Sequence, residues 1–252
     1  MKVGQSRFRV LISIIMIAVC GAFWAHAQQS TPVRSVGSWM SLFNGSTLDG
    51  WNGREGVWKV EDGAITGEIL GGPGEVSTNI FWTGGQPADF ELKAEIRMEG
   101  DLVNTGVVYR SDVQPPAAGA NAGRGAINAP YLLRGPQLDL EATNRYSGQY
   151  YEIAMPRGLL VRRGEMLETD GTQSEVIAQV GDAKVLASFV KSDDWNQVRV
   201  IAHNDTMIHV INGHVMSVVV DRNASARKKG FVAFQLEGQG KVRIRNVLLR
   251  TD

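Results

Sequence analysis

The chain has 252 residues, of which 26 are Lys or Arg and 26 are Asp or Glu, with one cysteine. The only basic cluster, Arg227-Lys228-Lys229 before Gly230, indicates a solvated turn, so the charge pattern excludes nucleic acid as an expected partner. The length suits one all-β domain, and no interior linker is long enough to divide it.

The first 27 residues have the pattern of a signal peptide. Lys2, Arg7 and Arg9 precede an apolar run over residues 10–25, and Ala25-His26-Ala27 supplies the small residues that signal peptidase needs. The run is shorter than the about twenty residues of a membrane span. The sequence therefore predicts a signal peptide at 1–27, a short linker at 28–38 and one domain at 39–252. The expected location is periplasmic or secreted, in a bacterium, with no membrane span after cleavage.

The single cysteine, Cys20, lies inside this first segment. Its removal leaves no disulfide to brace the mature chain, so stability must come from the core. Lipid anchoring at Cys20 stays open as an alternative, although Val19 stands where a lipoprotein signal favours a small residue.

Strand patterns begin the domain. Residues 58–60 and 64–67 predict two short strands joined at Asp62-Gly63, a dipeptide that favours the primed turn of a hairpin. Residues 91–98 alternate strictly between charged and apolar side chains, which predicts a strand with one buried face. Its buried side chains would be Leu92, Ala94, Ile96 and Met98.

Three further segments predict strands whose second face is polar rather than apolar. These are residues 104–110, residues 136–141 followed by 147–152, and residues 231–237. Because successive side chains on a strand point to opposite faces, Val108 and Arg110 would share one face. By the same rule, Gln137, Asp139 and Glu141 would lie together, as would Gln235 and Glu237. An outer face of a soluble sheet can be polar for no functional reason, but strands that each offer amides or acids could form a groove for a polyhydroxylated ligand.

Two segments interrupt the strand pattern. Residues 113–130 are rich in Gly, Ala, Pro and Asn, which predicts a long loop able to cover such a groove. Residues 151–164 mix arginines with glycines and predict a second loop beside the same face, with Arg157 as a candidate substrate-binding residue.

The last third of the chain returns to short strands. Asp182 is a candidate cap for one short helix over 183–190, and strands are expected at 197–202, 207–211, 214–220 and 241–250. Turns are expected at Asn204-Asp205 and Asn212-Gly213. Frequent turn signals and little helix favour an all-β fold, an antiparallel sandwich or jelly roll.

The chain resembles the DUF1080 family in a series of blocks that occur in order. The blocks are SLFNGSTLDGW at 41–51, WKVEDGAITG at 58–67, DFELKAEIR at 89–97, NTGVVYR at 104–110, PQLDL at 136–140, SGQYYE at 147–152, the turn Asp194-Trp195-Asn196, Ile211-Asn212-Gly213, AFQLE at 233–237 and VRIRNVLLR at 242–250. The family is described as 3-keto-disaccharide hydrolase, or 3-keto-glucoside 1,2-lyase and 3-keto-2-hydroxyglucal hydratase. The resemblance covers about residues 39–250, although no single block is specific.

The resemblance implies a concanavalin-like jelly roll of two antiparallel sheets with sugar bound on the concave face. It implies a carbohydrate substrate, a 3-keto-glucoside, and therefore a separate glucoside 3-dehydrogenase that makes this substrate. Trp39, Phe43, Trp51 and Trp58 are expected to pack in the core or at sheet edges rather than to bind sugar.

The chemistry of that family assigns roles to the polar residues. A ketone at C3 acidifies the hydrogen at C2, so a base can remove it while the group at C1 leaves, and water then adds to the enone. Such a site needs a base with a raised pKa, a donor to the enolate oxygen and an acid for the leaving oxygen. The carboxylate candidates are Asp139, Glu152 and Glu237, with Arg110 as electrostatic stabiliser. Gln137 and Gln235 would hold hydroxyls, and Tyr151 would stack on the ring or supply a proton.

Histidine and metal ligation stay open. Family members often carry a histidine where this sequence has Glu237, and His209 matches another position where relatives can carry one. His209 is included as a possible substrate-binding residue, although a lone histidine on a strand is more often structural. No cofactor is predicted. Asp139, Glu152, Glu237 and His209 are acceptable ligand types for a divalent metal, but no spacing signature links them.

Two other function classes remain possible from the sequence. A noncatalytic carbohydrate-binding domain would have an open groove without a desolvated acid. An ordinary glycosidase would need two carboxyls flanking the scissile bond, and Glu237 with Asp139 could meet that requirement. The keto-glycoside lyase or hydrolase instead predicts that Asp139, Glu152 and Arg110 converge in one pocket with a poorly solvated carboxyl.

Overall fold

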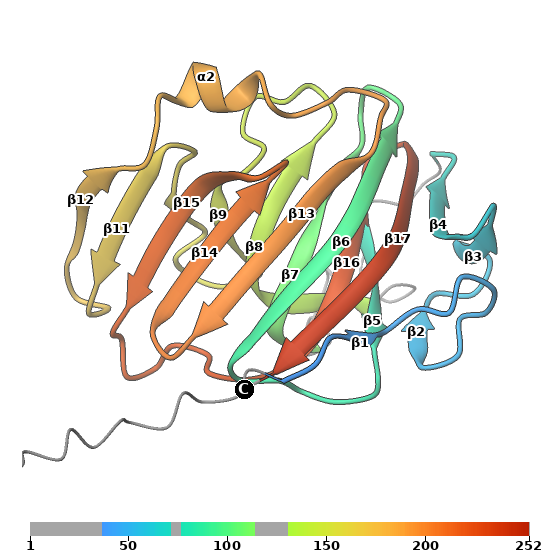
Figure 1. The fold of residues 1–252 in the computed structure, drawn as a ribbon, viewed down its shortest axis with the longest axis horizontal. Coiled ribbons are helices and arrows are strands. Elements are labelled where there is room, and N and C mark those ends of the chain that lie inside the picture. Colours follow the sequence, from blue (N-terminus) through green and yellow to red (C-terminus); the bar gives the residue numbers. More distant parts are fainter. Residues whose placement is uncertain (1–36, 72–76, 114–130, 252) are drawn as a thin grey trace, which may run out of the picture. The chain divides into compact units, whose positions relative to one another are not determined.

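Two β-sheets packed face to face form the part of the chain that the computed structural model describes, residues 37–71, 77–113 and 131–251 (Figure 1). The predicted signal peptide, nearly all of the 28–38 linker, and residues 114–130 of the predicted long loop lie outside these described residues. Within the described residues, no helix is long and apolar enough to cross a membrane.

The larger sheet has ten strands within these ranges and faces the viewer in Figure 1. Neighbouring strands within this sheet run antiparallel, except β11 and β15, which run parallel. In order, it contains β12 (Ser174–Gln179), β11 (Glu165–Thr169), β15 (His214–Asp221), β14 (Thr206–Ile211), β13 (Asn196–His203), β6 (Phe90–Glu99), β17 (Gly240–Thr251), β4 (Ala64–Ile69) and β3 (Trp58–Glu61), while β1 (Met40–Ser41) pairs with β17.

The smaller sheet lies behind the larger one and is antiparallel throughout. In order, its strands are β10 (Leu159–Val161), β9 (Tyr150–Ile153), β8 (Leu133–Glu141), β7 (Asn104–Val113), β16 (Phe231–Glu237), β5 (Ser77–Trp82) and β2 (Trp51–Gly53). The order places the late strand β16 between β7 and β5, so segments more than a hundred residues apart become neighbours. The predicted all-β jelly-roll sandwich is confirmed, and its two sheets are antiparallel as predicted except at the β11–β15 pair.

Side chains that alternate inward from both sheets form the main core. On β6 the predicted apolar face is confirmed, because Leu92, Ala94, Ile96 and Met98 are all buried. The expected packing of Phe43, Trp51 and Trp58 is also confirmed, since each lies in this core.

The predicted Asx-Gly hairpin turns form as expected. Asp62 and Gly63 have φ of 51° and 74° between β3 and β4, and Asn212 and Gly213 have φ of 49° and 83° between β14 and β15. Two successive residues in the left-handed region match the primed turn, whose twist suits a hairpin. The two turns pair β3 with β4 and β14 with β15, and both depend only on residues adjacent in the sequence.

Two local predictions need correction. Asp182 caps the helix α2 (Ala183–Ala187) by accepting from the backbone N–H groups of Lys184 and Val185, but the helix is shorter than the predicted 183–190. Beyond Ala187, the bonds at Phe189 and Val190 reach back only three residues. The predicted loop at 151–164 is wrong in part, because this segment contains the end of β9 and all of β10.

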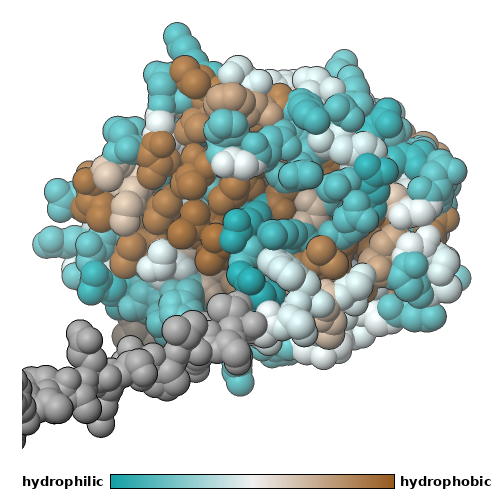
Figure 2. Space-filling view, viewed as in Figure 1, coloured by the Kyte–Doolittle hydropathy of each residue, from teal (hydrophilic) through white to brown (hydrophobic). Residues whose placement is uncertain are grey.

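The outer face of the larger sheet carries an apolar centre with hydrophilic side chains around it (Figure 2). Ile201, Ile208, Val210 and Val215 line a groove of about 630 Å³ there. The outer face of the smaller sheet is different, because its centre is polar.

Candidate functional site

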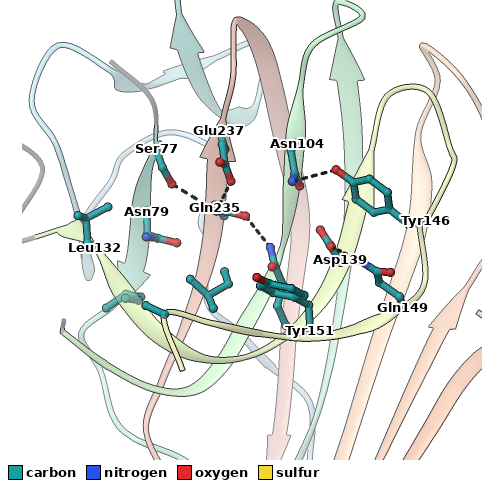
Figure 3. A pocket seen from close by; sticks show the side chains of 14 residues that line it. Ser77, Asn79, Asn104, Leu132, Asp139, Tyr146, Gln149, Tyr151, Gln235 and Glu237 are labelled. Carbon is teal, nitrogen blue, oxygen red and sulfur yellow. Dashed lines mark hydrogen bonds between the residues drawn. The ribbon is translucent and has the colours of Figure 1, made fainter. Parts of the chain in front are cut away.

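A cavity of about 420 Å³ opens on the outer face of the smaller sheet (Figure 3). Carboxyl, amide and hydroxyl groups line one part of it, and aliphatic side chains line another. The lining residues are Ser77, Asn79, Asn104, Leu132, Leu133, Gln137, Asp139, Tyr146, Gln149, Tyr151, Ile153, Ala154, Gln235 and Glu237.

The polar part of the cavity follows from the strand register. Residues paired across neighbouring antiparallel strands point to the same face. Gln235 pairs with Asn79 on one side and with Gly106 on the other, and Gly106 pairs with Asp139. One row across four strands therefore places Asn79, Gln235 and Asp139 on the cavity face.

The adjacent row adds a second carboxylate. Glu237 pairs with Ser77 on β5 and with Asn104 on β7. The two carboxylates, Asp139 on β8 and Glu237 on β16, thus lie in neighbouring rows and are separated by strand β7. The cavity between them is bounded by amides and hydroxyls.

Gly106 leaves room for a chain of amide hydrogen bonds across the cavity floor. Gln137 Nε2 donates to Gln235 Oε1 at 2.6 Å, and Gln235 Nε2 donates to Glu237 Oε2 at 3.0 Å. A Cβ on Gly106 would lie 2.4 Å from Gln137 Nε2 and 2.4 Å from the Leu138 carbonyl oxygen, well inside contact distance. The glycine therefore permits the link between β8 and β16.

Asp139 is the most strongly perturbed carboxyl in the cavity. It is 4% exposed, and burial raises its pKa to about 7 even though Gln149 donates a hydrogen bond that lowers it; the charges of Glu237 and Glu141 add to the rise. Gln149 Nε2 donates to Oδ2 at 2.8 Å, whereas the buried Oδ1 has no hydrogen-bond partner among the described residues. A carboxyl that titrates near neutral pH with a free oxygen can accept or donate a proton.

Two other groups can supply or hold protons. Burial raises the pKa of Glu237 above the ordinary glutamate value, and the hydrogen bond from Gln235 opposes this rise. Burial, with the negative charge of Asp139, raises the pKa of Tyr146 to about 12, so its phenol stays protonated. Asn104 Nδ2 donates to Tyr146 Oη at 3.3 Å and orients that phenol.

Five of the predicted site residues lie around this one cavity: Gln137, Asp139, Tyr151, Gln235 and Glu237. Tyr151 comes from β9, pairs with Gln137 and is 37% exposed. The structure does not bring the other four predicted site residues to the cavity lining.

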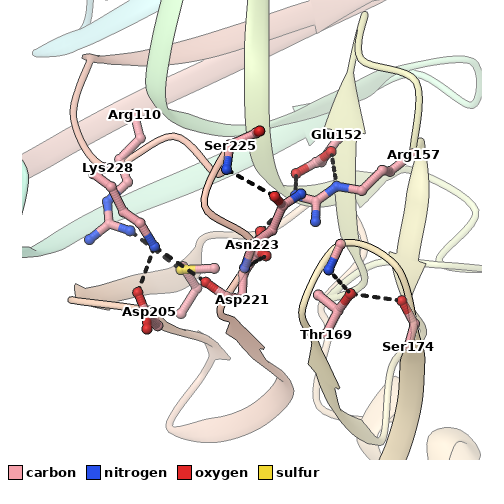
Figure 4. Close-up of polar contacts among 12 residues, drawn as sticks. Arg110, Glu152, Arg157, Thr169, Ser174, Asp205, Asp221, Asn223, Ser225 and Lys228 are labelled. Carbon is pink, nitrogen blue, oxygen red and sulfur yellow. Dashed lines mark hydrogen bonds and ion pairs between the residues drawn. The ribbon is translucent and has the colours of Figure 1, made fainter.

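Glu152 and Arg157 form an ion cluster with Asp221 between the two sheets (Figure 4). Glu152 follows Tyr151 on β9, so strand alternation turns it to the opposite face, where it is 1% exposed. Arg157 Nε donates to Glu152 Oε2 at 2.9 Å, and Nη2 donates to Asp221 Oδ2 at 2.6 Å. Burial acts to lower the pKa of Arg157, but the hydrogen bonds to the two carboxylates raise it above the ordinary value. The expected place of Glu152 and Arg157 beside the substrate is therefore corrected.

Arg110 is also directed away from the cavity. The pairing of β7 with β8 shifts between Val108 and Asp112, and Arg110 has φ of 44° in this bulge. A bulge adds a residue to one strand and changes which face the next side chain meets. Arg110 consequently donates to the carbonyls of Ala88 and Asn204, both at 2.9 Å, and to Asp89 Oδ1 at 3.1 Å. The expectation that Arg110 shares a face with Val108 and converges with Asp139 is corrected for this reason.

His209 lies in the interior between the sheets. It is fully buried, hydrogen-bonds with Tyr109 Oη at 2.9 Å and Ser217 Oγ at 3.2 Å, and stacks on Tyr150 with ring centroids 5.4 Å apart. Burial lowers its pKa to about 3, so the ring is neutral at physiological pH. The predicted substrate contact is corrected, because the β14 side chain at this position faces inward.

The sequence reasoning missed several cavity residues. Ser77, Asn79, Asn104, Tyr146 and Gln149 line the cavity but were not proposed as site residues. Asn104 lies in the block at 104–110 and Gln149 in the block at 147–152. The polarity of each, at the end of an apolar strand, could have indicated a site residue. Ser77 and Asn79 reach the site only because β5 pairs with β16.

The described residues contain no group of three or more His, Cys, Asp or Glu placed to hold a metal ion. The groups that converge on the cavity are two carboxyls with raised pKa values, one protonated phenol and several amides. This set can bind hydroxyls through amides and transfer protons through the acids.

Residues 38–250 match the model of a family described as the 3-keto-alpha-glucoside-1,2-lyase-like domain. The curated proteins include no match to the chain.

Solved structures share the fold at low sequence identity. A candidate glycosyl hydrolase from Parabacteroides distasonis ATCC 8503 matches with a TM-score of 0.53 and 14% identity, covering 85% of this chain and 100% of that one. A protein of unknown function with a galectin-like fold from Bacillus subtilis matches with a TM-score of 0.51 and 11% identity, covering 80% and 89%. At these identities the likeness concerns the fold alone.

Proposed function

Because this chain belongs to the 3-keto-alpha-glucoside-1,2-lyase-like domain family, we propose that it cleaves the glycosidic bond of 3-keto-glucosides by elimination followed by hydration. The observation that carries the proposal is Asp139, a buried carboxyl with its pKa raised to about 7 and one unpartnered oxygen beside the cavity. A base for a carbon acid needs raised basicity and a lone pair that no hydrogen-bond donor occupies.

In the first step, Asp139 accepts the C2 proton and the C2–H electron pair forms the enolate of the C3 ketone. Tyr146, which stays protonated, donates a hydrogen bond to the developing enolate oxygen. The enolate then expels the group at C1, so the C1–O bond breaks and its electron pair leaves with the oxygen. Asp139, which now carries the C2 proton, returns a proton to this oxygen.

In the second step, water adds to C1 of the resulting enone and C2 regains a proton. The net reaction is hydrolysis without an oxidant or reductant. The substrate already contains the ketone, so a separate enzyme must oxidise the glucoside at C3. We propose that a glucoside 3-dehydrogenase acts before this protein.

The amide chain has a binding role in this proposal. Gln137, Gln235 and Asn79 present donors and acceptors from neighbouring strands, and a hexose offers hydroxyls in a similar row. Tyr151 offers an aromatic face that is exposed to the cavity.

The test compares 3-keto-glucosides with the matching unoxidised glucosides in deuterated water. We expect cleavage of the keto substrates alone, with deuterium incorporation at C2, and loss of both in Asp139→Asn. Glu152→Gln provides a matched control, because that carboxyl lies between the sheets in the Arg157 cluster. Tight binding of sugars without turnover would replace the proposal with a carbohydrate-binding module, and cleavage of plain glucosides would replace it with an ordinary two-carboxylate glycosidase.

We further propose that the protein is exported and that its signal peptide is cleaved after Ala27, on the basis of the basic, apolar and small-residue pattern of 1–27. The mass of the mature protein purified from the periplasm or medium tests this. A mass that retains residues 1–27 would contradict it.

A further inference from the structure

The cavity face changes from acidic to apolar along the strands. One row contains Glu237 and Asn104, and the next contains Gln235 and Asp139. The pairing continues with Val108 opposite Gln137 and Gln137 opposite Tyr151. The strands thus carry the acids at one end of the cavity and progressively less polar groups toward the other.

The far end of the cavity is mainly aliphatic, although the Asn79 amide, which donates to the Tyr131 carbonyl at 2.8 Å, lies beside Leu132 (Figure 3). This end is lined by Leu133, the first residue of β8, and Ile153, the last residue of β9, together with the adjoining Leu132 and Ala154. In Figure 3, Leu132 lies at the opposite side of the pocket from Asp139 and Gln149. A ligand that fills this cavity must therefore present hydroxyls to one end and apolar surface to the other.

The aliphatic end rests on a second hydrophobic cluster that is separate from the main core. Its buried members are Phe81, Val108, Leu133 and Ala233, with Tyr131, Ile153 and Phe231 packed against them. The outer face of an antiparallel sheet is ordinarily polar where it meets water. Leu133 belongs to this cluster and Ile153 packs against it, so the apolar end of the cavity is continuous with buried apolar side chains.

We propose that the group released from C1 is an apolar aglycone, preferably an aromatic one, which binds against Leu132, Leu133 and Ile153 beside the ring of Tyr151. This inference rests on the proposed function and names the substrate class for the same site. A second sugar at this position would bury hydroxyls against aliphatic side chains that offer no partner, which is unfavourable. An aromatic ring would bury apolar surface there and could pack edge-to-face or offset against Tyr151.

The experiment compares two 3-keto-glucosides of the same anomer whose leaving groups are both primary alcohols: benzyl β-glucoside and gentiobiose, each oxidised at C3 of its nonreducing glucosyl unit. The α-linked pair, benzyl α-glucoside and isomaltose, is tested in the same way. Matching the leaving groups keeps intrinsic reactivity similar, so the ratio of their kcat/KM values reports the aglycone contacts. We expect the benzyl substrate to be favoured roughly tenfold or more, as hydrophobic pockets discriminate on this scale.

Two variants test whether the apolar end of the cavity causes the preference for the benzyl substrate. Ile153→Asn places an amide in the apolar end, and we expect it to reduce the benzyl-to-gentiobiose ratio roughly tenfold, mainly through KM of the benzyl substrate. Ile208→Asn is the matched control, because Ile208 is a half-buried isoleucine that faces outward on the other sheet. This control is expected to leave the ratio unchanged.

The outcomes separate the inference from the proposed function. Equal kcat/KM for the two substrates, or preference for gentiobiose, would overturn the apolar aglycone while the keto-glucoside reaction stands. If neither substrate is cleaved, the reaction proposal fails, and calorimetric binding of unoxidised benzyl glucoside against gentiobiose still tests the apolar end. Binding that is no tighter for benzyl glucoside, or that Ile153→Asn does not weaken, would then overturn it.

Discussion

Replacing Gln149 with Leu should shift the pH dependence of the reaction toward higher pH. Gln149 Nε2 donates at 2.8 Å to Asp139 Oδ2, and this hydrogen bond lowers the pKa of a carboxyl that burial has raised to about 7. Leucine has a similar size but offers no donor. The substitution therefore removes a stabilising contact from the ionised form of Asp139 and leaves its burial in place.

The size of the shift follows from the bond that is lost. A hydrogen bond to a charged group contributes about 1.5–3 kcal/mol, part of which water can replace in an open cavity. One pKa unit corresponds to about 1.4 kcal/mol, so we expect the pKa of Asp139 to rise by about one unit. Because the base must be ionised, activity is lost as the pH falls through this pKa.

The assay is the pH profile of kcat/KM on a 3-keto-glucoside, which reports the ionisations of the free enzyme. For the unsubstituted protein we expect the acid limb to have its midpoint near pH 7, the value to which burial raises the pKa of Asp139. In Gln149→Leu the midpoint should move up by about one unit, and activity should recover at high pH. Gln239→Leu is the control, because exposed Gln239 donates instead to the Leu70 carbonyl. An unmoved midpoint, or a uniform loss at every pH, would refute the assignment of Asp139 as the titrating base.

Three further substitutions test the site and its support. Asp139→Asn should stabilise the protein at pH 8 by a few kcal/mol: burial raises the folded-state pKa from 3.8 to about 7, so wild-type stability falls as the pH rises through that interval. Urea unfolding should show this gain in the free energy of unfolding at pH 8 and little of it near pH 4. The absence of a gain at pH 8 would contradict the raised pKa of Asp139. Gly106→Ala should lower the free energy of unfolding by about 1–3 kcal/mol and lower kcat/KM, because its Cβ would clash with Gln137 and the adjacent backbone. Unchanged stability and kcat/KM would show that the cavity floor tolerates a side chain at this position. Arg157→Met should destabilise by about 3–5 kcal/mol at pH 7, because it leaves Glu152 buried without its partner, with partial recovery in acid. Exposed Arg162→Met is its control, and equal effects of the two on urea unfolding would argue against the ion cluster.

Local sequence patterns determined the parts of the protein that depend on near neighbours. The alternation in β6 predicted its buried face, and the Asp62-Gly63 and Asn212-Gly213 pairs predicted their hairpins. The same two-residue period placed Gln137 with Asp139 and Gln235 with Glu237, and both pairs line the cavity. Strand alternation also places Tyr151 and Glu152 on opposite faces of β9, so the sequence alone argued against assigning both residues to one site.

Tertiary structure decided which of these faces meet and where the local period breaks. The bulge at Arg110 redirects a side chain that strict alternation would place beside Val108, and its cause lies in the pairing with β8 and β16. The sheet order brings Ser77 and Asn79 beside Gln235 from a strand more than 150 residues away in the chain. The pKa of Asp139 rises through burial by the assembled sheet, which no neighbouring residue in sequence specifies. Sequence therefore determined the side chains on each strand, whereas long-range pairing and desolvation determined which of them share a site.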